Sequence, residues 1–120
     1  MRMVHVFTAA VLAAGLGLVT LSGAASAASA EKGAIAFKTY GCWQCHGFLG
    51  QGSVATSNGK TLAPDTLPYE AFSAFVRGTN RQMPPYREAV LPESDLADIH
   101  AYLSSIPKGP DYKTIPLLNN

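Results

Sequence analysis

Apolar residues recur at three- and four-residue spacing in three segments of the chain, residues 31–40, 67–78 and 91–106. This spacing matches the period of a helix, so it predicts three helices that each bury one face. The last segment is the most regular, because its apolar side chains fall within a sector of roughly 120°. Those side chains are Leu96, Ile99, Tyr102, Leu103 and Ile106.

Prolines and glycines mark the ends of the predicted helices. Pro68 suits the first position of the second helix, and Gly78 suits its C-terminal end. Pro92 marks the start of the third helix. The glycine-rich residues 47–67 predict a long loop, and Pro84 interrupts any helix between positions 79 and 90. Because no strand pattern is present, the predicted fold class is all-α, with three to four short helices.

Residues 1–30 have the character of a leader. A basic start with Arg2 precedes an apolar run over residues 6–21, and small residues with A-x-A endings follow. This order predicts a secretory signal peptide, cleaved after Ala27 or Ala30, and therefore an exported or periplasmic protein. The alternative is an uncleaved membrane anchor, although the run is shorter than the roughly 20 apolar residues that a span needs.

The charge balance excludes one class of partner. Of nine Lys and Arg residues one, Arg2, lies in the leader, which leaves eight against eight Asp and Glu residues. A formally neutral mature chain lacks the basic surplus of a nucleic-acid-binding protein. We expect one domain over residues 31–106 and an extended tail over residues 107–120. The apolar residues of that tail lie along the body or against a partner.

Both cysteines of the chain stand in one short stretch, Y-G-C-W-Q-C-H-G, as Cys42 and Cys45, with His46 directly behind them. A disulfide across so short a loop would stabilise little. C-x-x-C-H is the attachment motif of c-type haem, and it predicts one covalently bound haem c. The two thiols can form thioethers with it, and the histidine can ligate its iron. Covalent attachment would also support a thin core, because a chain of this size buries only about 60% of its unfolded surface.

Two other uses of the thiols are weaker. A zinc site could combine Cys42, Cys45, His46 and His100, but the adjacent Cys45 and His46 are awkward for a closed tetrahedron. A dithiol redox pair typically lies near a βαβ unit, and the sequence has no strand pattern.

The opposite face of the iron has one favoured ligand. Met83 is the only methionine after the leader, and it precedes two prolines that keep this segment stiff and non-helical. The alternative is that Met83 fills a gap in the core. His100, the other histidine, lies about 100° from the centre of the apolar face of its helix. We therefore expect His100 at the surface and Met83 at the iron.

The sequence resembles the class I, monohaem cytochromes c. The resemblance spans roughly residues 31–107 and is carried by Gly33 and Phe37, by the segments 42–47 and 83–84, and by residues 99–103. It implies that the first and last helices cross. By this analogy, Gly33 and Phe37 should meet Ile99 and Tyr102.

The chain departs from this family at one position. The family's Gly-Pro-x-Leu segment, whose proline carbonyl accepts the histidine Nδ1–H, corresponds here to Gly59-Lys60-Thr61-Leu62. The carbonyl of Lys60 or of nearby Pro64 could take that role.

The resemblance implies one-electron transfer rather than catalysis on a substrate. We expect a soluble carrier or the cytochrome subunit of an exported dehydrogenase, with an electron-donor dehydrogenase and an electron-acceptor oxidase or cytochrome as partners. Lys38, Arg81 and Arg87 flank the motifs and either face an acidic partner or are ordinary solvated charges. The alternative function is a haem-based ligand sensor or peroxidase-like protein, which would need an open iron face.

Overall fold

The computed structural model describes residues 27–53 and 59–119, and within them it is helical, with no strand. This confirms the predicted all-α class. The elements in chain order are α1 (Ala30–Thr39), α2 (Trp43–His46), α3 (Tyr69–Gly78), α4 (Glu93–Ser105), η1 (Tyr112–Thr114) and η2 (Pro116–Leu118). Nearly all of the predicted leader lies outside the described residues, as do residues 54–58.

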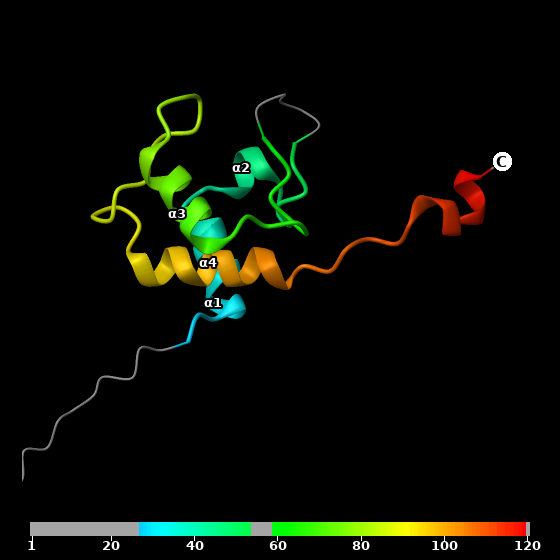
Figure 1. Cartoon of the computed structure of the whole chain (residues 1–120), viewed down its shortest axis with the longest axis horizontal. Helices are drawn as coiled ribbons and strands as arrows, with labels where there is room; N and C mark the ends of the chain where they lie inside the picture. Colours follow the sequence, from blue (N-terminus) through cyan, green and yellow to red (C-terminus); the bar gives the residue numbers. More distant parts are fainter. Residues whose placement is uncertain (1–26, 54–58, 120) are drawn as a thin grey trace, which may run out of the picture.

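The contact between α1 and α4 organises the fold (Figure 1). Gly33 lies so close to α4 that a Cβ atom built there would be 1.9 Å from the backbone oxygen of Asp98. One turn further along, the rings of Phe37 and Tyr102 stand 5.7 Å apart between centroids. The expected crossing of the first and last helices is therefore present.

The apolar faces of three helices meet in one small core. Phe37 of α1 is almost fully buried, as are Leu96, Ile99 and Leu103 of α4. Helix α3 adds Phe72 and Val76 to the same cluster. Most of the periodic positions of the sequence are thus buried, but Tyr102 and Ile106 lie half-buried at the edge of the core. Phe75, which the pattern placed on the apolar face of α3 with Phe72 and Val76, is 55% exposed.

A proline directly precedes each of two helices. Helix α3 starts at Tyr69, and α4 starts at Glu93. In both cases the proline before the helix has an extended ψ, 145° at Pro68 and 151° at Pro92, so each proline caps its helix from outside. Pro68 is therefore not the first helical residue, as the pattern suggested.

The tail leads away from the helices (Figure 1) and ends in η1 and η2. Its apolar residues do not cover the body, because Leu117 is 85% exposed and Tyr112 and Leu118 are also exposed. Its own bonds hold its shape, since the Asn119 side-chain amide donates to the carbonyls of Tyr112, Lys113 and Ile115. Within the described residues, we find no helix with the length and apolarity needed to cross a membrane.

Gly33→Ala tests the helix crossing. The added methyl group would overlap the Asp98 carbonyl, so we expect the free energy of unfolding to fall by about 1–3 kcal/mol or more. Gly78→Ala is the matched control, because a Cβ atom there meets nothing within 4 Å. Thermal unfolding of both variants measures the difference, and equal stabilities would contradict the close approach.

Candidate functional site

The cysteine motif forms a single helical turn directly after α1. Gly41 makes the junction with a φ of 76°, which glycine adopts without strain. The N–H of Cys42 donates to the carbonyl of Phe37, and the N–H of His46 donates to the carbonyl of Cys42. Residues three and four apart lie on one side of such a turn. The two thiols and the imidazole therefore project from one short, anchored segment.

Both thiols are unpaired. Cys42 is half-buried against the core and Cys45 is exposed. Burial raises the pKa of the Cys42 thiol to about 11. At neutral pH this sulfur is protonated, so the apoprotein does not present a thiolate at this position.

One ring nitrogen of His46 is already engaged. Its Nδ1 lies 2.7 Å from the carbonyl oxygen of Lys60. A carbonyl can only accept, so Nδ1 carries the proton, and in the neutral imidazole Nε2 keeps its lone pair. Of the two expected acceptors, Lys60 and Pro64, the structure selects Lys60. The missing proline is no obstacle, because the backbone oxygen alone makes this bond.

Gly59 brings that carbonyl into place, a role that the sequence analysis missed. A Cβ atom at Gly59 would stand 1.5 Å from the backbone oxygen of Cys45, so only glycine allows this approach. The loop is further held where the Ser53 N–H donates to the Gly59 carbonyl. The only signal in the sequence was the place of Gly59 just before Lys60.

Met83 is half-buried, and its side chain packs against the core cluster. Two neighbours fix its segment. The Thr79 hydroxyl donates to the Met83 carbonyl at 3.3 Å, and the Tyr86 hydroxyl donates to the carbonyl of Tyr40 at 3.0 Å. Since Tyr40 precedes the cysteine motif by two residues, the methionine segment is tied to the same side of the molecule as the thiols.

Arg77, near the end of α3, holds the segment from Tyr86 to Leu91 at both of its ends. Its Nη1 donates to the carbonyls of Tyr86 and Leu91, at 2.9 and 2.6 Å. Its Nη2 pairs with the Glu93 carboxylate at 2.7 Å. Glu93 also accepts from the Tyr69 hydroxyl, and the bonds from Tyr69 and Arg77 lower the pKa of its carboxyl. No motif in the sequence pointed to this role of Arg77.

His100 is held away from the cysteines. Its Nε2 donates to the Leu67 carbonyl at 2.8 Å, and its ring packs against those of Tyr69 and Phe72. It is half-buried, as a residue on the flank of the apolar face can be. In the part of the chain that the structure describes, no three His, Cys, Asp or Glu side chains are placed to hold a metal ion. The zinc grouping of the two cysteines with both histidines therefore does not form.

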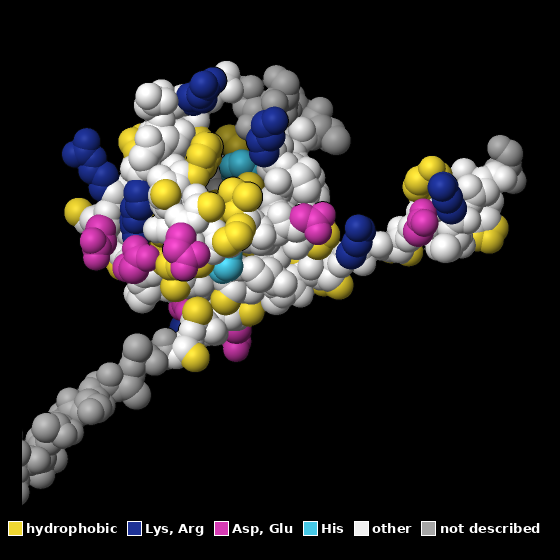
Figure 2. Space-filling view, viewed as in Figure 1, with side chains coloured by type: hydrophobic (Ala, Val, Ile, Leu, Met, Phe, Trp, Pro, Cys, Tyr) yellow, Lys and Arg dark blue, Asp and Glu magenta, His cyan; other side chains and the backbone are white. Residues whose placement is uncertain are grey.

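The surface around α2 suits a flat apolar group. Figure 2 shows hydrophobic side chains gathered around a histidine at the position of α2, with the surface hollowed beside them. Phe48, next to this turn, stacks on Trp43 with the rings 4.7 Å apart yet remains 53% exposed. Two thiols and an imidazole nitrogen with a lone pair are groups that can attach and ligate haem c.

A family model described as cytochrome c oxidase, cbb3-type, subunit III, matches residues 28–103. The chain belongs to this family. It is a c-type cytochrome, an electron-transfer protein rather than an enzyme, and haem c is the cofactor that this family implies. No curated protein and no solved structure matches the chain.

The link through Arg77 in this c-type cytochrome is tested with Arg77→Lys. A lysine keeps the charge but cannot reach two carbonyls and a carboxylate at once. Leaving partly buried carbonyls without a donor costs about 1–3 kcal/mol, so we expect a clear drop in thermal stability. Arg87→Lys, at an exposed position, is the control and should change little. An Arg77→Lys variant as stable as this control would contradict the role.

Proposed function

We propose that this c-type cytochrome transfers single electrons through one haem c, bound by Cys42 and Cys45 and ligated by His46 and Met83. The observation that carries the proposal is the His46 ring, whose Nδ1–H donates to the Lys60 carbonyl, so that Nε2 is free as a ligand beside two free thiols. When bound, haem c supplies an Fe(III)/Fe(II) couple.

The chain's residues would set the properties of that couple. A carbonyl bond to Nδ1 orients an imidazole and raises its basicity, so Lys60 would strengthen His46 as a ligand. A thioether ligand raises the reduction potential relative to a second nitrogen ligand. Apolar burial acts in the same direction, because it disfavours the extra positive charge of the oxidised site. These effects favour a protein that accepts electrons readily.

Met83 decides between this function and the alternative. With its thioether at the iron no coordination position is left, and a sensor or peroxidase needs one. The anchoring of its segment through Thr79 and Tyr86 supports Met83 as the residue that would hold the iron together with His46, since both bonds restrict where the methionine can lie.

The partners follow from the redox role. We propose an exported dehydrogenase as donor and an oxidase or another cytochrome as acceptor. The family description names an oxidase subunit, which supports contact with an oxidase. The exposed apolar tail supports lasting association with one partner rather than free diffusion, because exposed contiguous apolar residues usually mark contact surfaces.

Met83→Leu tests the axial ligand. We expect the oxidised wild-type protein to be low-spin with the weak red absorption band of a methionine–Fe(III) bond. The variant should lose that band, have a lower potential and bind carbon monoxide faster when reduced. Gln82→Leu, at the exposed neighbouring position, should leave all three properties unchanged. Rapid carbon monoxide binding by the reduced wild type would exclude the carrier function.

Association through the tail is tested by gel filtration of native extract. We expect the wild-type cytochrome to elute with a dehydrogenase or oxidase activity, and the double variant Leu117→Ser, Leu118→Ser to elute alone. Ile35→Ser is the control, because Ile35 is also exposed but lies on α1. A wild type that already elutes alone would identify a free carrier.

A further inference from the structure

Two positions in the sequence, after Ala27 and after Ala30, satisfy the pattern of leader cleavage, and the structure distinguishes them. Helix α1 begins at Ala30, and Ser29 is its N-cap residue. The Ser29 hydroxyl accepts the Lys32 N–H at 3.3 Å, and the Ser29 carbonyl accepts the Gly33 N–H at 2.9 Å. The Ser29 carbonyl thus accepts the first bond within the helix, and its hydroxyl satisfies one of the N–H groups that a helix start leaves without partners.

Ser29 also joins α1 to α4. Its N–H donates to the Asp98 carboxylate at 2.6 Å. This bond adjoins the point where Gly33 touches the Asp98 backbone, so it lies at the crossing on which the fold depends.

Cleavage after Ala30 would remove all three bonds. The chain would then begin at Glu31, inside the first turn of α1, and place its α-ammonium at the positive end of the helix dipole. Asp98 would lose the donor that Ser29 provides. Cleavage after Ala27 keeps the cap, the bond to Asp98 and the whole first turn.

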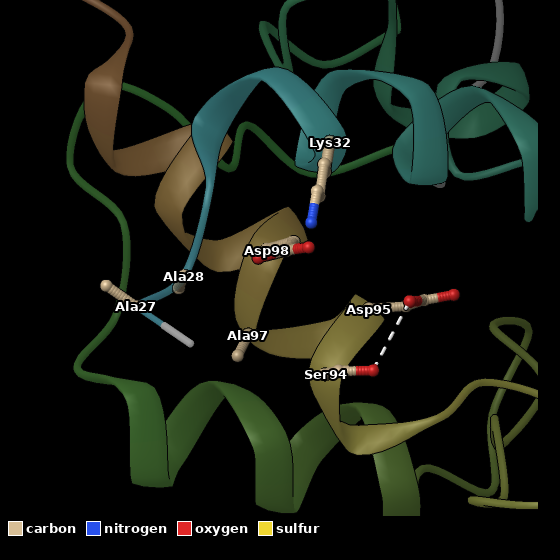
Figure 3. Close-up of a pocket in the computed structure, with 7 residues that line it drawn as sticks. All are labelled: Ala27, Ala28, Lys32, Ser94, Asp95, Ala97 and Asp98. Carbon is tan, nitrogen blue, oxygen red and sulfur yellow. Dashed lines mark hydrogen bonds between the residues drawn. The ribbon is translucent and has the colours of Figure 1, made fainter. Parts of the chain in front are cut away.

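The surroundings of Ala28 suit a positive chain terminus. Ala27 and Ala28 line a pocket together with two carboxylates, Asp95 and Asp98, and one ammonium group, that of Lys32. Figure 3 shows Ala28 beside this pocket. Asp95 already accepts the Tyr40 hydroxyl at 2.7 Å. The pocket therefore contains two negative charges and one positive charge, so one further positive charge would neutralise it.

We infer that the exported chain is processed between Ala27 and Ala28, and that the new α-ammonium of Ala28 pairs with Asp98. The mature N-terminus is then a structural part of the α1–α4 crossing. Both Ala27 and Ala28 are exposed, so a peptidase reaches this bond without disturbing the helices. This inference does not depend on the haem, only on export.

The cleavage position is read directly from the full chain, expressed with its own leader in a bacterium that attaches haem c and recovered from the periplasm. N-terminal sequencing and intact mass should give a chain that begins at Ala28. A chain that begins at Glu31, or that keeps Met1, overturns the inference. A protein that begins at Ala28 but is colourless, and so carries no haem, would contradict the proposed function and still support this inference.

The pairing with Asp98 is tested by moving the α-ammonium group of the mature N-terminus away from that carboxylate. Two glycines inserted before Ala28 keep Ser29 in place but displace the α-ammonium, so we expect the Tm to fall by roughly 2–5 °C. Asp98→Asn should abolish the difference between the extended and the native terminus. Glu88→Gln, an exposed control, should preserve that difference. Equal effects of the extension in the Asp98→Asn variant and in the wild type would refute the pairing.

Discussion

The close approach of α1 and α4 at Gly33 is the constraint on which this domain depends. The cysteine turn begins at Cys42, three residues after the end of α1, so the direction of α1 determines where the thiols and His46 point. Helix α4 supplies the other wall of the core through Leu96, Ile99 and Leu103. A side chain at position 33 would separate the two helices and shift every group that follows from α1.

Backbone carbonyls hold most of the site. Lys60 offers its carbonyl to His46, Tyr40 offers its own to Tyr86, and Arg77 binds two more beyond Met83. Such bonds suit a domain with a small core, because they position irregular segments that have little apolar surface to bury. The apolar contacts set the helices, and the polar bonds set the loops that bring ligands toward one face.

Local patterns in the sequence predicted the structure well where each pattern is compatible with only one kind of element. Helical periodicity identified α1, α3 and α4, and most of the predicted apolar positions proved to be buried, although Phe75 of α3 is exposed. It was less reliable at ends and at single side chains. The caps at Pro68 and Pro92, and the position of His100 against two aromatic rings, depend on backbone angles and neighbours that spacing does not encode. That the cysteines, His46 and Met83 bind haem stays a prediction.

By itself, the sequence determined the all-α class, the apolar faces of the helices and the presence of two thiols and an imidazole within one turn. These properties are local, since they follow from residue type and short-range spacing. Only the tertiary structure decided which carbonyl orients His46, why position 59 must be glycine, and what Arg77 and Ser29 connect. Those contacts join residues far apart in the chain, and only the packing of α1 and α3 against α4 brings them together.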